Sequence, residues 1–331
     1  MKKNLGIFLI LMVICAITAY LDPKFLGAYN LQNTIRWSGI YGIMAIGVSL
    51  VIITGGIDMT IGSVIGLIGC LLPFLLTKYG WHLRYAIPTV LAISAVIGLV
   101  NGLLVTKLRL QPFVVTLCGW LFYRGIVRYI AGDATQGFGT TCQPMKNFLK
   151  KNFLEYFTGV PHSFDIPMVF ILMLIIAAIF AFFLNRTIWG RYLLALGRNE
   201  QAAKFSGIRT DRIIILAYTL SGLLAGLTGI ILVANVNSAD PSGFGLGYEM
   251  YAIAGAVLGG CSLKGGEGSI LGVVIGSALL RVLYNSINIL GIPTQLEFAV
   301  IGIVILIGVM ADEVVRRIAA KRAALARIKA A

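Results

Sequence analysis

The sequence predicts an all-α, polytopic membrane protein with about ten transmembrane helices and both termini in the cytoplasm. Of the 331 residues, 58% are hydrophobic and only 12% are charged, whereas a soluble domain carries about 25% charged residues. Apolar stretches of about 17 to 25 residues recur along the chain, and this is the length that crosses a hydrocarbon core about 30 Å thick. A closed barrel would need strands of about 10 residues with alternating polarity, and the apolar runs are too long and too continuous for that.

The first apolar run, residues 5–21, follows Lys2 and Lys3 and resembles a secretory signal peptide. Because no clear small-x-small cleavage site is present, we predict an uncleaved first span. Hydropathy predicts the later spans at 38–54, 57–77, 85–105, 112–131, 166–185, 213–234, 248–261, 269–290 and 296–311. The predicted turn or packing glycines, Gly55, Gly56, Gly259 and Gly260, mark either full reversals of the chain or re-entrant loops.

The net charge of +14 could indicate a nucleic-acid partner, so the positions of the charges have to decide. With the N-terminus in the cytoplasm, most of the 27 Lys and Arg residues fall in cytoplasmic segments. This asymmetry is the positive-inside pattern of a membrane protein. The sequence therefore predicts no nucleic-acid binding.

A single transmembrane domain is predicted over residues 1–331, with three distinctive polar segments. Residues 132–165 form a periplasmic loop, residues 185–212 form a basic cytoplasmic loop, and residues 312–331 form a basic cytoplasmic tail, an amphipathic helix on the inner leaflet. A weak internal repeat, around 38–105 and 248–311, pairs Gly55-Gly56 with Gly259-Gly260. Transporters are often built from such repeats, although close helix packing also explains Gly-rich spans.

Catalytic motifs are missing from the sequence. It contains no Gly-x4-Gly-Lys-Ser/Thr phosphate-binding loop, and no Cys, His and carboxylate cluster with metal-ligand spacing. We therefore expect no enzyme activity, no metal site and no cofactor. Energy for uphill transport would come from a partner subunit or from an ion gradient.

The basic loop contains the most specific motif. Its sequence from Gly190 to Ile208 resembles the cytoplasmic coupling segment of the ribose-type permease family of ABC importers. Further resemblances follow at the family's spacing: Thr54 to Ser63, which is similar to the Gly-Gly-Ile-Asp signature, Gln111 to Leu117 with Arg124-Gly125, and Gly247 to Glu249 with Leu258 to Ser269. The resemblance covers residues from about 30 to 312. Tyr284-Asn285 departs from the paired Asn that the family often has.

This resemblance implies a multi-pass permease subunit in the cell inner membrane that moves a monosaccharide or similar small polar solute by alternating access. It also implies ABC ATPase subunits, a periplasmic or lipid-anchored sugar-binding protein, and a permease homodimer or heterodimer within the membrane lipid. Permeases for branched-chain amino acids or nucleosides share the fold, but the Gly-Gly-Ile-Asp signature favours sugars. An ion-coupled secondary transporter is a further alternative, disfavoured because Asp58, Glu249 and Glu297 fall near predicted span ends.

The resemblance places ATPase coupling on a short helix that ends at Gly207. We expect this helix to sit in a groove of the ATPase, where Ala202 and Ala203 permit close approach and Glu200 offers a charged anchor. The predicted coupling residues are Arg198, Asn199, Glu200, Ala202, Ala203 and Gly207. The alternative is a solvated loop that only fixes the topology.

Polar residues within spans are costly and are therefore candidates for the substrate path. These candidates are Asp58, Asn101, Trp120, Arg124 and Asn285. Each has a structural alternative: helix N-capping or charge placement at a helix N-terminus for Asp58, interhelical hydrogen bonds for the two asparagines, packing or an interface belt for Trp120, and an outer-interface position for Arg124. Arg281 is expected to pair with Glu249 or Glu297.

Overall fold

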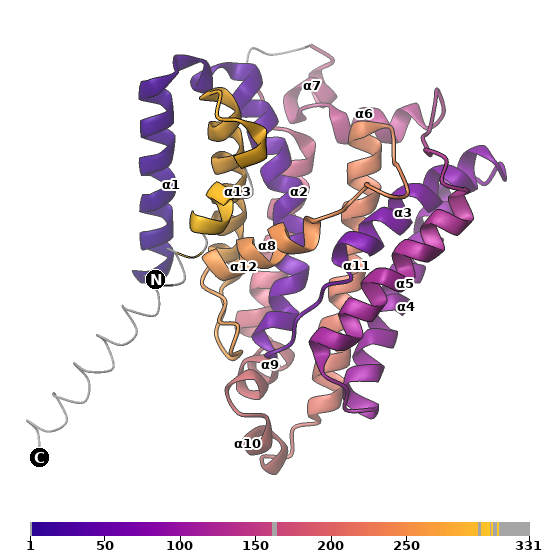
Figure 1. The fold of residues 1–331 in the computed structure, drawn as a ribbon, viewed down its shortest axis with the longest axis vertical. Coiled ribbons are helices and arrows are strands. Elements are labelled where there is room, and N and C mark those ends of the chain that lie inside the picture. Colours follow the sequence, from indigo (N-terminus) through magenta and orange to yellow (C-terminus); the bar gives the residue numbers. More distant parts are fainter. Residues whose placement is uncertain (1, 161–163, 297–298, 305, 307–309, 311–331) are drawn as a thin grey trace, which may run out of the picture.

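The computed structural model describes residues 2–160, 164–296, 299–304, 306 and 310. Apart from two isolated β-bridges, the regular structure of these residues is helical (Figure 1). The elements are α1 (Lys2–Leu21), η1 (Pro23–Leu26), α2 (Ala28–Ile53), α3 (Ile61–Thr77), α4 (Leu83–Lys107), α5 (Pro112–Ala131), α6 (Gln143–Lys150), α7 (Phe153–Thr158), α8 (Met168–Arg186), α9 (Ile188–Arg198), α10 (Glu200–Phe205), α11 (Thr210–Val236), α12 (Tyr248–Leu258), α13 (Ile270–Ile289) and η2 (Thr294–Leu296).

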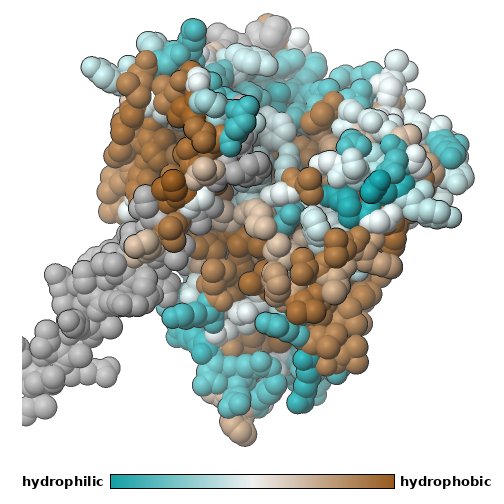
Figure 2. Space-filling model, viewed as in Figure 1, coloured by the Kyte–Doolittle hydropathy of each residue, from teal (hydrophilic) through white to brown (hydrophobic). Residues whose placement is uncertain are grey.

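Six of the described helices are long and apolar enough to cross a membrane: α2, α4, α5, α8, α11 and α13. The apolar helices at 5–21, 61–77 and 248–258 are shorter. Figure 2 shows hydrophobic surface around the middle of the molecule and hydrophilic surface at its top and bottom. The all-helical, polytopic prediction is thus confirmed. The predicted span 296–311 is only partly among the described residues, and the predicted tail at 312–331 lies outside them.

Helix α11 occupies the centre of the bundle, where it packs against α2, α3 and α4. Its most extensive contact is with α4, where both helices place small residues on the shared face. A Cβ on Gly98 or Gly102 of α4 would strike the backbone of α11, and a Cβ on Gly222 or Gly226 of α11 would strike Ser94 of α4. Such stripes of small residues let helix backbones touch within a membrane.

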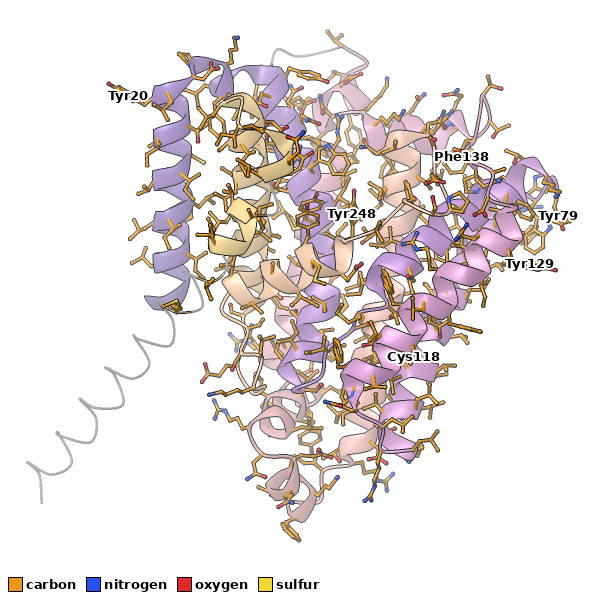
Figure 3. The ribbon with its side chains drawn as sticks, viewed as in Figure 1. Tyr20, Tyr79, Cys118, Tyr129, Phe138 and Tyr248 are labelled. Atoms are coloured by element: carbon orange, nitrogen blue, oxygen red, sulfur yellow. The ribbon has the colours of Figure 1, made fainter. Side chains whose placement is uncertain are left out.

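Two helices of the bundle are shorter than the sequence predicted. The predicted spans 57–77 and 248–261 become α3 and α12, which begin at Ile61 and Tyr248 near mid-height of the molecule (Figures 1 and 3). With 11 residues, α12 is only about 16 Å long and cannot cross a membrane by itself. Residues 56–60 run back into the bundle without helical structure before α3 begins. These are discontinuous helices, tolerated in a membrane where protein covers the free backbone.

The ends of α2 and α12 have the same turn. In each, a glycine with positive φ follows the helix, at +85° for Gly55 and +86° for Gly260, and its amide and the next one bond back to the last turn, as in a Schellman motif. The bonds are Gly55 N to Ile52 O (2.8 Å) and Gly56 N to Val51 O (3.1 Å), and Gly260 N to Val257 O (2.8 Å) and Cys261 N to Ala256 O (3.0 Å). The equivalent residues are thus Gly55 and Gly260, one position away from the pairing read from the sequence. The wider repeat stays a prediction.

Candidate functional site

A buried polar cluster fills the break between α2 and α3. We define it as Asp58, Thr60, Asn101 and Ser221, whose side chains are at most 2% exposed. One carboxylate oxygen of Asp58 accepts from the Thr60 amide (3.0 Å) and hydroxyl (2.5 Å), and the other accepts from the Ser221 hydroxyl (2.8 Å). The Asn101 amide donates to the Thr60 hydroxyl at 3.2 Å. The cluster therefore ties the broken segment to both α4 and α11.

Two of the five predicted path residues, Asp58 and Asn101, meet in this cluster. Asp58 is not the N-cap of α3, because Thr60 holds that position without a capping side-chain bond. The capping alternative for Asp58 is therefore wrong. Its hydrogen bonds fix the extended segment instead, and a carboxylate with partners on two elements resists displacement because a buried unpaired charge is costly.

Arg124 lies beside the cluster on α5 and points into the bundle. Its guanidinium donates to the carbonyl oxygens of Phe244 (2.8 Å), Pro241 (3.1 Å) and Gly62 (3.2 Å). It therefore joins α5 to the start of α3 and to the segment that leads into α12. The outer-interface alternative is therefore wrong for Arg124, whereas Arg128 is exposed and pairs with Asp133 at 2.7 Å.

Glycines on α3 make room for these polar groups. A Cβ on Gly62 would overlap the Glu249 carboxylate, and a Cβ on Gly66 would lie 2.8 Å from the Arg124 guanidinium. Glu249 is 4% exposed, in the first turn of α12. Both Asp58 and Glu249 are thus buried close to the starts of interrupted helices. Glu297 lies outside the described residues.

Trp120 contacts the first turn of α3, whereas Asn285 lies in another part of the bundle. The Trp120 carbonyl accepts from the Ser63 hydroxyl at 2.7 Å, which joins α5 to α3. Asn285 is buried on α13 beside Ser286, which receives a hydrogen bond from Thr18 of α1 at 2.8 Å. None of the hydrogen bonds among the described residues joins Asn285 to the buried polar cluster.

Arg281 lies against aromatic rings and not against Glu249. Its guanidinium carbon is 4.5 Å from the ring centre of Tyr284 and 5.2 Å from that of Trp37. The expected pairing with Glu249 is therefore wrong. Cation–π contact accounts for a buried cation at this position.

The predicted coupling segment forms a helical knob, which we define as residues 197–207 at the end of α9 and through α10. Asn199 caps α10, since its side chain accepts from the Ala202 amide at 3.0 Å. Glu200 and Lys204 form an ion pair of 2.6 Å one turn apart. The helix ends where Gly207 adopts a φ of +80° and the Ile208 amide bonds to the Ala203 carbonyl at 3.1 Å. The knob forms the bottom of the molecule in Figure 1, where Figure 2 shows hydrophilic surface.

The base of the knob contacts two parts of the bundle at Gly197, whose nearest neighbours are backbone atoms, while the Arg198 side chain packs on Gly266. A Cβ on Gly197 would overlap the Ile53 carbonyl at the end of α2 and the Gly266 amide in the loop before α13. Gly266 also donates to the Ile53 carbonyl at 2.8 Å, and a Cβ on Gly265 would lie 2.8 Å from the Gly197 carbonyl. Three motifs that are far apart in sequence therefore meet at one point.

On the outer surface of the knob, one predicted coupling residue is missing because it is buried, and one exposed aromatic residue that was not predicted is present. Ala203 is only 4% exposed, because it faces its own chain, so it cannot touch a partner as expected. Ala202, Glu200 and Gly207 are exposed. Phe205 is 92% exposed, the highest value among the large hydrophobic side chains of the described residues. Its isolation between Lys204 and Ser206 was the sequence signal that could have identified it.

Long apolar helices, two buried interruptions and a polar knob at one end together define a multi-pass membrane transport protein. The chain belongs to the permease family described as "Branched-chain amino acid transport system / permease component", whose family model matches residues 30–309. It is thus a multi-pass membrane permease of bacterial ABC importers and not an enzyme, since ATP hydrolysis belongs to a partner subunit. Such a family implies an ATPase and a binding protein as partners.

Curated relatives cover nearly the whole chain. It is 37% identical over 302 residues to the ribose import permease protein RbsC of Escherichia coli strain K12, covering 91% of each chain. It is 38% identical over 319 residues to RbsC of Bacillus subtilis strain 168, covering 94% of this chain and 92% of the relative. The fructose import permease protein FrcC of Rhizobium meliloti is 30% identical over 316 residues, covering 95% of this chain and 86% of the relative. No solved structure matches.

Proposed function

We propose that this permease carries a monosaccharide into the cell, and that ribose is the first sugar to test. The relatives at 37% and 38% identity are named as ribose import permeases, and a third is named as a fructose import permease. The interior supports a small polar solute, because carboxylate, amide and hydroxyl groups gather where α3 and α12 begin. Asp58, Asn101, Trp120 and Arg124 are the proposed path residues there, and Asn285 is a separate candidate on α13.

The topology that we propose has about ten spans, with both termini and the knob in the cytoplasm. Residues 132–165, which include α6 and α7, then face the periplasm, where a soluble or lipid-anchored binding protein delivers the sugar. The ATPase approaches the knob from the opposite side. A second permease, identical or related, completes the path.

Backbone contact at Gly197 is the observation that carries the mechanism. When the ATPase changes conformation, a displacement of α10 reaches the end of α2 and the loop before α13 together, because no side chain lies between Gly197, Ile53 and Gly266. Both contacts adjoin interrupted helices, whose starts hold the buried polar groups. Two ATPase conformations would thus favour two arrangements of the path, which is what alternating access requires.

Reconstitution tests this function. Proteoliposomes that contain the permease, its ATPase and its binding protein should accumulate labelled ribose only with internal ATP, and an ATPase variant that cannot hydrolyse ATP should give none. Uptake by the permease alone under a proton gradient would instead support an ion-coupled transporter. Because the family description names branched-chain amino acids, labelled leucine belongs in the same assay, and its preferential uptake would replace the sugar proposal.

A further inference from the structure

An apolar groove opens between α8, α9 and α11, away from the buried polar cluster. It has a volume of about 530 Å³ and is lined by Phe183, Trp189, Arg212, Ile215, Leu216 and Thr219. Phe183 lies one turn before the end of α8, and Arg212 lies in the first turn of α11. From Arg212 to Thr219 the lining rises about 10 Å along α11. The groove thus starts at the knob end of the bundle and runs into its apolar band.

Positive charge lies at the start of the groove. The lining residue Arg212 is exposed, and Arg186 and Arg191, which follow the lining residues Phe183 and Trp189 by three and two positions, are exposed as well. Among the described residues, none of these three guanidinium groups has an ion pair, and the carboxylate of Asp211, the residue before Arg212, is engaged by Lys107. The unneutralised charge is suited to an anionic ligand.

The helix at the mouth of the groove has the character of an interfacial helix. On α9, Leu193 and Leu196 are buried, whereas Ile188, Trp189 and Tyr192 are between 39% and 54% exposed. Exposed Trp and Tyr are enriched at the level of lipid headgroups, and an amphipathic helix with basic residues lies in that plane. Trp189 and Arg212 therefore mark the boundary between headgroups and acyl chains.

We propose that this groove binds one anionic phospholipid of the cytoplasmic leaflet. One of its acyl chains lies along Phe183, Ile215 and Leu216, and its phosphate lies at Arg212, with Trp189 at the glycerol level. Basic pockets at the cytoplasmic ends of membrane helices are suited to such headgroups. The lipid would contact α9 and α11, the helices on either side of α10, and therefore stabilise the position of the knob.

Native mass spectrometry can count the lipids that stay on the full-length permease. The protein is taken from nanodiscs made of equal parts phosphatidylglycerol and phosphatidylcholine. The wild type should retain one phosphatidylglycerol in preference to phosphatidylcholine. Arg212→Gln should lower this preference about fivefold, since a basic residue near an anionic surface contributes about that factor. Ile215→Trp should fill the groove and lower retention of both lipids.

Matched control variants distinguish an effect at the groove from the general effect of losing an exposed arginine or gaining a bulky side chain. Arg84→Gln removes another exposed arginine, and Val96→Trp introduces a tryptophan at a 54% exposed position on α4. Both variants should retain lipid like the wild type. The proposal is overturned if Arg212→Gln and Ile215→Trp match these controls. It is also overturned if glycerol phosphate at constant ionic strength displaces the bound lipid, which indicates a soluble phosphate site, or if Ile215→Trp changes only the permease dimer, which indicates a protein interface.

Discussion

Replacing Phe205 with alanine should weaken ATPase docking more than any other single truncation on the knob. The ring is 92% exposed at the end of α10, while the charges of Glu200 and Lys204 already satisfy each other. An exposed ion pair contributes little to binding. The docking energy is therefore expected to come from the aromatic side chain and not from Glu200, the anchor expected from the sequence.

The size of the effect follows from the surface that the ring offers. Full burial of a Phe side chain is worth about 1.5–3 kcal/mol, and nearly all of this side chain is available to a partner. A loss of about 2 kcal/mol corresponds to an approximately 30-fold higher Kd. Phe205→Leu should keep most of the affinity, because it retains a large apolar side chain.

The assay is a titration of nucleotide-free ATPase onto the permease in nanodiscs. Phe157→Ala is the control, because this residue is 69% exposed on α7, at the end of the molecule opposite the knob (Figure 1). Thermal melting of each variant checks that the bundle stays folded. A Kd for Phe205→Ala within twofold of the wild-type value would refute the docking assignment.

Three further predictions concern the bundle. Gly197→Ala should destabilise the permease by about 1–3 kcal/mol, measured by chemical unfolding, whereas Gly125→Ala should not, because a Cβ there meets open space. Asp58→Ala should reduce ATP-driven uptake, because it leaves three hydrogen-bond donors without their buried acceptor. The Kd for the ATPase should stay within twofold of the wild-type value. Unchanged uptake would mean that Asp58 has a purely structural role. The Arg128 guanidinium, which is bonded to Asp133, lowers the pKa of that carboxyl below its ordinary value of 3.8. The ion pair therefore stabilises the fold above this pH, and the stabilisation is lost as the pH falls through the lowered pKa. The difference in melting temperature between wild type and Asp133→Asn should shrink over the same pH range.

Hydropathy predicted the helical class because a bilayer demands long apolar segments whatever their packing. It did not locate the interruption before α3, since the predicted span 57–77 begins four residues before Ile61, and the predicted span 248–261 extends three residues beyond the end of α12. The two glycine pairs indicated turns there. Only the structure shows that the left-handed residues are Gly55 and Gly260.

The candidate site was predictable only in part, because its contacts depend on how the helices pack against one another. Asp58 and Asn101 are conspicuous as polar residues in apolar segments, but their link through Thr60 depends on how α3 meets α4. Ser221 looks like any small residue of a packed membrane helix. Ala203 was assigned to the docking surface because a short helix shows no inner face in its sequence, and its burial follows from packing within the chain.

The glycines at the base of the knob allow ATPase binding to be tested separately from transport. Gly197 touches both the end of α2 and the Gly265-Gly266 loop, so a side chain at this point would press on two parts of the bundle at once. We expect docking to depend on the exposed end of α10, whose side chains this substitution leaves unchanged. A permease with Gly197→Ala should therefore still bind its ATPase while its uptake falls, whereas Phe205→Ala should lose both. The same phenotype for both variants would mean that the base and the end of the knob act as one docking surface.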